Sequence, residues 1–185
     1  MGARRFALLA LAAALTAATP RAGADSPGPL GQLVDAAAQR LQTADPVAAL
    51  KWHTMGDIED PPRVGQVLTA VSADADAHGV DTGYVTRVFN DQINATEAIE
   101  YSRFAQWKLD PGSAPASAPD LPASRATIDA LSRQMVDQIV AHWDALHSPG
   151  CAAALREAQA TAAAARQLDG LYQQALAFAT RSYCA

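Results

Sequence analysis

The chain is short of positive charge, of cysteine and of long apolar runs. It has 14 Lys and Arg against 19 Asp and Glu, which argues against nucleic acid and anionic membranes as partners. It has two cysteines, and none of its four histidines lies at a metal-ligand spacing from them, so a metal site is disfavoured. No segment alternates with the period of a β-strand. These absences favour an all-α protein that acts without metal or nucleic acid.

The first 24 residues have the features of a secretory signal peptide. Two arginines precede an apolar stretch over residues 6–18, and the small-x-small cleavage site Ala22-Gly23-Ala24 follows Pro20. The apolar stretch is too short to cross a bilayer, and nothing downstream is longer. We therefore expect export to the periplasm or the medium. The mature chain, residues 25–185, would carry 11 basic and 19 acidic residues and have no membrane association.

The two cysteines, Cys151 and Cys184, lie in the last fifth of the chain. In an exported protein an even number of cysteines indicates disulfides, and two cysteines allow one pairing. The alternatives are a metal site or two free thiols. We expect the disulfide, which would stabilise the fold by about 3–4 kcal/mol.

Apolar residues recur at helical spacing along nearly the whole mature chain, and caps, glycines and prolines divide the pattern into helices. The first helix runs from Leu30 to Trp52 and kinks or restarts at Asp45-Pro46, read as N-cap and first helical residue. The later elements are a helix capped by Asp60-Pro61-Pro62 and ended by His78-Gly79, a long helix over 82–109, a Pro-rich loop over 110–123, a helix through Ile128 and Leu146, and a C-terminal helical hairpin over 150–185 formed by helices 151–167 and 169–182. The cysteines would tie the outer ends of this hairpin together.

Polar side chains occupy the apolar face of the predicted long helix. On a helical wheel Gln92 and Thr96 fall among its valines and isoleucines, and Glu100 falls at the edge of the same face. A buried, unpaired carboxylate costs several kcal/mol unless it is paired or protonated, roughly the scale measured for broken buried ion pairs. We therefore expect either a cation beside Glu100 or a protonated, neutral Glu100 carboxyl.

Long basic side chains border the apolar stripes of the other helices, at Arg40, Lys51, Arg63 and Arg125. From such margins a long side chain can reach inward. Taken singly, each of these arginines is more commonly a surface residue, and a helical Thr commonly bonds its own backbone. Spacing alone therefore indicates an exported helical domain that binds a small dianion.

Five features together resemble one enzyme family. They are VDAAAQRLQTADPVAALKW, IEDPPRV, YVTRVFNDQINATEAIEYSRFAQWKL, LPASRATIDAL and the cysteine pair. Over nearly all of the mature chain they are similar to the secreted, mycobacterial-type chorismate mutases, the exported gamma subclass of the all-helical AroQ-type enzymes. The resemblance implies a single-domain helical bundle and the Claisen [3,3] rearrangement of chorismate to prephenate. It also implies a homodimer whose active site lies within one chain, and no cofactor.

The resemblance places seven residues in the active site. They are catalytic Lys51, Glu100 and Arg125, and substrate-binding Arg40, Asp60, Arg63 and Thr96. Where cytosolic relatives have a Glu that faces the ring hydroxyl, this chain has Val64, so Asp60 or the backbone would have to recognise that hydroxyl. Glu100, partly desolvated, is expected to have a pKa raised toward neutrality and to act as a neutral donor.

Two alternatives remain at this point. Isochorismate-pyruvate lyase uses the same helical fold for a related pericyclic reaction, although the long helix and the extra C-terminal helices favour the mutase. The other is an exported helical interaction protein that keeps the fold without the activity. Competent residues at all the matched site positions weigh against it.

Overall fold

The computed structural model describes residues 28–117 and 120–184, and the predicted signal peptide lies outside them. The elements are α1 (Gly31–Gln42), α2 (Ala44–Thr54), α3 (Pro61–Ala77), α4 (Thr82–Leu109), the 3₁₀ helix η1 (Pro111–Ser113), α5 (Leu121–Ala141), α6 (Trp143–Leu146), α7 (Cys151–Ala165) and α8 (Gly170–Ala179). The described part contains no strand, so the predicted all-α class is confirmed. None of its helices is both long and apolar enough to span a membrane.

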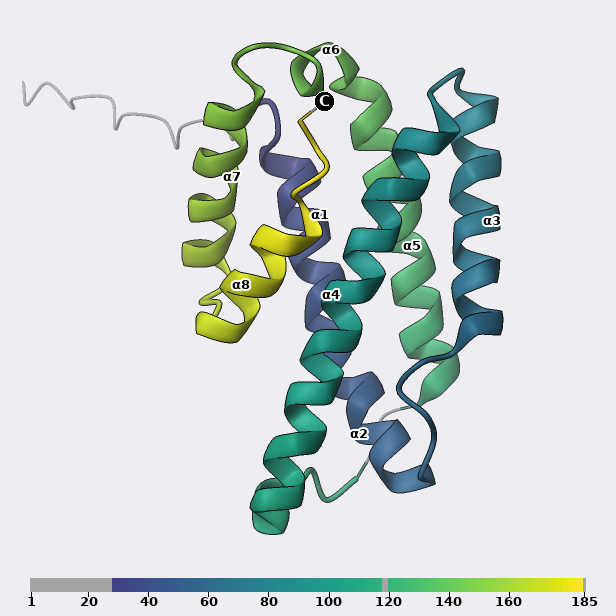
Figure 1. The fold of residues 1–185 in the computed structure, drawn as a ribbon, viewed down its shortest axis with the longest axis vertical. Coiled ribbons are helices and arrows are strands. Elements are labelled where there is room, and N and C mark those ends of the chain that lie inside the picture. The colour runs from purple at the N-terminus through teal and green to yellow at the C-terminus, as the bar shows by residue number, and fades with distance from the viewer. Residues whose placement is uncertain (1–27, 118–119, 185) are drawn as a thin grey trace, which may run out of the picture.

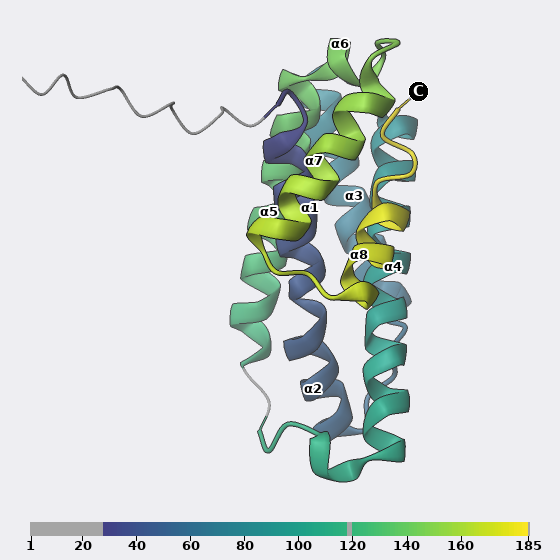
Figure 2. The same ribbon diagram turned by 90° about the vertical axis from the view of Figure 1, so that its left-hand side faces the viewer.

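The long helix α4 runs along the molecule with α3 beside it (Figure 1). In the perpendicular view α1 and α2 lie end to end, and α7 and α8 flank the upper part (Figure 2). The main helix contacts are α1 with α5 and α7, and α4 with α2, α3 and α8. These contacts place α1 and α4 at the centre of the bundle.

Helix α1 is buried on most of its surface. Leu33, Val34 and Leu41 are fully buried, and so are the alanines between them. Small alanine side chains let the neighbouring helices approach closely, while each buried Leu or Val contributes about 1.5–3 kcal/mol through the hydrophobic effect. The polar residues Gln32 and Gln42 lie on its exposed side, whereas Arg40 lies on its buried side.

Local signals set the predicted ends of α3 and α4 correctly. Asp60 is the N-cap of α3, and its Oδ1 accepts a hydrogen bond from the Arg63 backbone N–H at 3.1 Å. The same helix ends at His78, and Gly79 follows with φ +68°, a left-handed conformation that favours glycine. The predicted bounds of α4 are also confirmed.

The break between α1 and α2 lies two residues earlier than predicted. Thr43 separates the helices, and its hydroxyl donates to the Arg40 carbonyl at 2.7 Å. Pro46 then falls in the first turn of α2, where a backbone N–H would have no intrahelical partner. Asp45 is not the cap, because its carboxylate pairs with Arg103 of α4 at 2.6 Å.

Two predicted bounds around α5 are wrong. The helix begins at Leu121, with Pro122 in its first turn, so the Pro-rich loop ends before residue 123, and part of it forms η1. The predicted continuous helix through Leu146 also breaks at His142. After the break the Trp143 ring packs edge-on against Tyr84 of α4, with ring centroids 5.1 Å apart.

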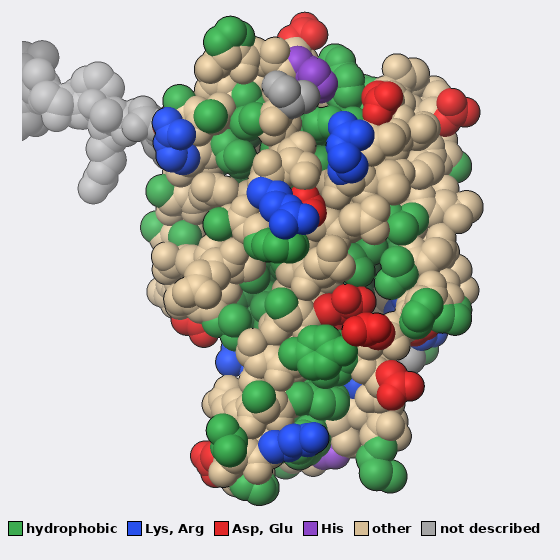
Figure 3. Space-filling view, in the orientation of Figure 1, with side chains coloured by type: hydrophobic (Ala, Val, Ile, Leu, Met, Phe, Trp, Pro, Cys, Tyr) green, Lys and Arg blue, Asp and Glu red, His purple; other side chains and the backbone are tan. Residues whose placement is uncertain are grey.

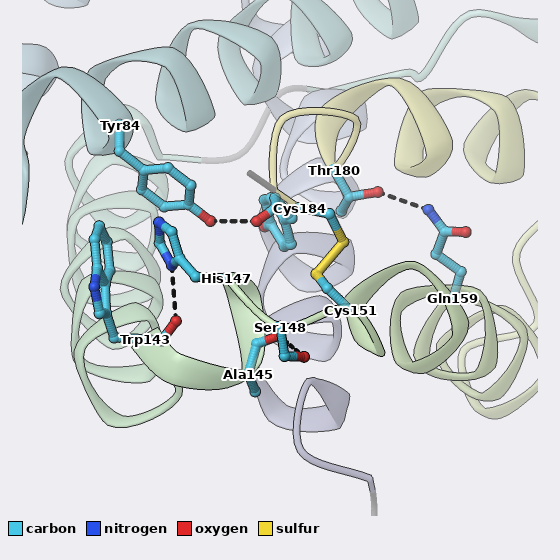
Figure 4. Close-up of a disulfide and its surroundings, with 10 residues drawn as sticks. Tyr84, Trp143, Ala145, His147, Ser148, Cys151, Gln159, Thr180 and Cys184 are labelled. Atoms are coloured by element: carbon cyan, nitrogen blue, oxygen red, sulfur yellow. Dashed lines mark hydrogen bonds between the residues drawn. A yellow bond between two sulfur atoms is a disulfide. The ribbon is translucent and has the colours of Figure 1, made fainter.

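The predicted disulfide between Cys151 and Cys184 is confirmed (Figure 4). The helices of the predicted hairpin are shorter than expected, and they pack less on each other than on the bundle, α7 on α1 and α8 on α4. The C-terminal segment is also anchored to α4, where the Tyr84 hydroxyl donates to the Tyr183 carbonyl at 2.6 Å. The disulfide therefore holds two separately docked helices to one another.

Replacing both cysteines by alanine should lower the free energy of unfolding by about 3–4 kcal/mol, because the bond closes a long loop in the unfolded chain. Urea denaturation followed by circular dichroism measures the change. Wild-type protein denatured by urea in the presence of a reducing agent serves as the matched control. Its free energy of unfolding should equal that of the double variant. An unchanged urea midpoint in both samples would contradict the prediction.

Candidate active site

One cavity collects side chains from α1 to α5. All seven residues predicted for the site line it: Arg40, Lys51, Asp60, Arg63, Thr96, Glu100 and Arg125. The structure thus brings together, within one chain, residues that span 86 positions of the sequence. On the face shown in Figure 3, by contrast, acidic and basic side chains are scattered without forming a large patch of one sign.

The buried carboxylate of α4 is paired with a cation from α2. The Lys51 ammonium donates to Glu100 Oε2 at 2.7 Å and also to the Ile58 carbonyl. Glu100 is 3% exposed. Burial raises the pKa of Glu100 to about 7, although the charge and hydrogen bond of Lys51 act to lower it. Glu100 can therefore gain or lose a proton near neutral pH, as the polar face of the long helix predicted.

Arg40 is a buried cation without a carboxylate partner among the described residues. It is 4% exposed, and its one side-chain hydrogen bond runs from Nε to Ser132 Oγ at 3.2 Å. Burial, with the nearby charge of Arg63, lowers its pKa to about 10, so Arg40 remains charged at neutral pH. An uncompensated buried charge is costly unless an anion binds beside it. The position of Arg40 in the cavity wall therefore suits an anionic ligand.

The other two arginines lie nearer to solvent and have acidic partners. The Arg63 side chain donates to Asp129 Oδ1 at 2.5 Å. Arg125 is about half exposed, and its guanidinium lies 3.8 Å from Asp60 Oδ2. Asp60 thus caps α3 with one oxygen and faces Arg125 with the other. The cavity has a buried arginine at its base and more accessible arginines towards its edge.

Thr96 lines the cavity, but its hydroxyl proton is already used. It donates to the Gln92 carbonyl of the same helix at 2.8 Å, as a helical Thr commonly does. Its oxygen therefore faces the cavity as an acceptor. Val64 also lines the cavity and offers it only an apolar surface.

Comparison with known proteins gives the same family as the sequence motifs. The family model described as "Chorismate mutase type II" matches residues 31–101. The secreted chorismate mutase of Mycolicibacterium smegmatis is 56% identical over 179 residues, which cover 97% of this chain and 99% of that protein. That of Mycobacterium tuberculosis is 55% identical over 165 residues, covering 89% of this chain and 83% of that protein.

The chain belongs to the chorismate mutase family. A crystal structure of the chorismate mutase from Burkholderia thailandensis superposes with a TM-score of 0.80 at 32% identity, covering 84% of this chain and 99% of that one. The enzyme from Burkholderia phymatum gives a TM-score of 0.80 at 28% identity, covering 85% and 96%. The predicted export agrees with the word "secreted" in the names of the two mycobacterial relatives.

The sequence motifs missed several groups around this chorismate mutase cavity. Apart from Val64, which the resemblance had placed in the site, its apolar wall is formed by Val47, Ile58, Val67, Ile93 and Ile128. Behind the cationic groups lie Asp129 and Ser132 of α5 and the Ile58 carbonyl. Asp129 and Ser132 follow Arg125 at helical spacing, so the pattern of α5 places them on the same face of the helix as Arg125. A backbone carbonyl such as that of Ile58 leaves no signal in a sequence.

Proposed function

We propose that this cavity rearranges chorismate to prephenate and that its seven predicted residues perform the reaction. The observation that carries the proposal is Arg40, a buried charge without a carboxylate partner, in the same cavity as the Lys51–Glu100 pair. Chorismate is a dianion, and its rearrangement breaks a C–O bond and forms a C–C bond within one molecule. The protein needs only to hold the compact conformer and to stabilise the charge that develops.

The arginines bind the two carboxylates of the substrate. The planar guanidinium group matches a carboxylate with two parallel hydrogen bonds. Arg40 binds one carboxylate at the base of the cavity, where water is excluded. Arg63 and Arg125 bind the other, and both exchange part of their present contact with Asp129 or Asp60 for the substrate.

Lys51 and Glu100 act on the ether oxygen, which gains negative charge as its bond to the ring breaks. The two side chains now contact each other at 2.7 Å, so both reach the same part of the cavity. Lys51 donates from one side. Glu100 donates from the other side in its protonated form, which its burial favours.

We also propose that the enzyme is a homodimer in which each chain holds its own site, as the family resemblance implies. Support comes from the seven site residues, which one chain contributes without help. Sedimentation equilibrium should give twice the chain mass, and activity per chain should stay constant when dilution dissociates the dimer. Activity that disappears with dissociation would contradict an independent site in each chain.

Turnover of chorismate by the oxidised mature chain, residues 25–185, tests the function directly. Loss of chorismate absorbance measures the rate, and acid conversion of the product to phenylpyruvate identifies prephenate.

Lys51→Ala should reduce kcat about 10²–10³-fold because it removes a donor to the developing charge. Arg125→Ala should lower kcat/KM, and Lys108→Ala, exposed at the end of α4, should match wild type.

Failure of this assay would separate the alternatives. A folded protein that ignores chorismate but releases pyruvate from isochorismate would be a lyase. A folded protein inactive on both substrates would be the helical interaction protein. The names of the relatives, all chorismate mutases, favour the mutase.

The rate should fall as pH rises through about 7, because ionised Glu100 can no longer donate to the ether oxygen. Glu100→Gln, a permanent donor, should flatten this fall in kcat/KM. The stability of wild type should change in the same direction, since a carboxyl with a raised folded pKa stabilises the fold fully at low pH and loses this contribution as pH rises through about 7. A wild-type rate independent of pH from 6 to 9 would rule out this role.

A further inference from the structure

We propose that Ser132 is a positioning residue, which orients the Arg40 guanidinium toward a substrate carboxylate without neutralising its charge. This inference rests on the proposed function, because it assigns Arg40 to the substrate. Ser132 lies on α5 and is 4% exposed. It is separated from Arg40 by 92 positions in the sequence, and neither the motifs nor the predicted site included it.

The direction of the Ser132 hydrogen bonds is fixed by its surroundings. Its hydroxyl donates to the Ile128 carbonyl, one turn earlier in α5, at 2.7 Å. A serine hydroxyl has a single proton, so toward Arg40 the oxygen can only accept. The Arg40 Nε–H fills that acceptor at 3.2 Å. The two hydrogen bonds therefore have one possible direction: Arg40 donates to Ser132, and Ser132 donates to the Ile128 carbonyl.

The choice of Nε decides which part of the guanidinium remains for the ligand. A carboxylate can bind an arginine through its two terminal nitrogens or through Nε and one terminal nitrogen. Ser132 occupies Nε, and no other side-chain hydrogen bond of Arg40 is present among the described residues. The two terminal nitrogens are left for end-on, bidentate binding. The Phe89 ring, with its centroid 5.8 Å from the guanidinium carbon, restrains the group from another direction.

A neutral partner distinguishes Arg40 from the other paired arginines. Those arginines contact carboxylates in the pairs Arg63–Asp129, Arg103–Asp45, Arg125–Asp60, Arg166–Asp35 and Arg181–Asp91. A carboxylate at position 132 would bind Arg40 strongly, because both groups are buried, and would compete with the substrate. A hydroxyl fixes the orientation and leaves the positive charge for the ligand.

The test compares steady-state kinetics with chorismate for three substitutions at position 132. Ser132→Ala leaves Nε–H unpaired and the guanidinium free to turn, so KM should rise about tenfold while kcat stays within about twofold of wild type. Ser132→Thr keeps the acceptor and should restore most of the affinity. Ser132→Asp should raise KM more than Ser132→Ala does, because its carboxylate pairs with Arg40. Urea midpoints of the same variants measure folding separately.

The comparison of KM with the urea midpoint in Ser132→Ala distinguishes positioning from simple structural support. If Ser132 only held the helices together, Ser132→Ala would lower the urea midpoint and leave KM near the wild-type value, whereas loss of orientation of Arg40 raises KM at an almost unchanged midpoint. The matched control is Ser124→Ala, on the same helix, where the hydroxyl donates to the Asp120 carbonyl and lies outside the cavity. It should match wild type in KM.

Three outcomes decide the matter. A KM increase in the Ala and Asp variants, with near-normal KM in the Thr variant, supports the proposal. If Ser132→Ala does not fold, the contrast between the Thr and Asp variants gives the same decision. Normal KM in folded Ser132→Ala, or in Ser132→Asp, overturns the proposal but leaves the mutase function in place, whereas wild-type protein without chorismate turnover overturns both.

Discussion

The buried charge of Arg40 is the constraint that the fold must satisfy to form this cavity. A cation with 4% exposure and no carboxylate partner among the described residues opposes folding. The fold tolerates it because α1 is held by apolar contacts on several sides, with Leu33, Val34 and Leu41 fully buried. In the proposed function, the free energy of those contacts holds the charge of Arg40 in place before the substrate arrives. This is pre-organisation, which lowers the reorganisation needed in the transition state.

Burial changes the pKa values of two groups of the cavity in opposite directions, and both changes suit the dianion that we propose as its ligand. It lowers the pKa of Arg40 to about 10, which still leaves the side chain charged at neutral pH. It raises the pKa of Glu100 to about 7, which lets that side chain become neutral. With Lys51, Arg63 and Arg125 also present, the cavity is positive within a chain whose net charge is −5. The local excess of cations attracts a dianion that the rest of the molecule repels.

The C-terminal helices support the cavity from outside it. Helix α7 packs against α1, which carries Arg40, and α8 packs against α4, which carries Glu100. The bond between Cys151 and Cys184 joins them, and Asp91 of α4 binds the segment that precedes Cys184. Among the described residues, those that line the cavity include none from α7 or α8. We interpret this support as fixing the spacing of the two central helices.

The sequence by itself determined the helical class, the ends of α3 and α4, the cysteine pair and seven residues of the cavity, because each left a local or motif signal. Asp60 before two prolines is a strong N-cap signal, and two cysteines allow one pairing. Only the tertiary structure decided that Thr43 and His142 end their helices and that Ser132 holds Arg40. The physical reason is that these features depend on which helices pack together. A hydrogen bond between residues 92 positions apart exists only once α1 has packed against α5.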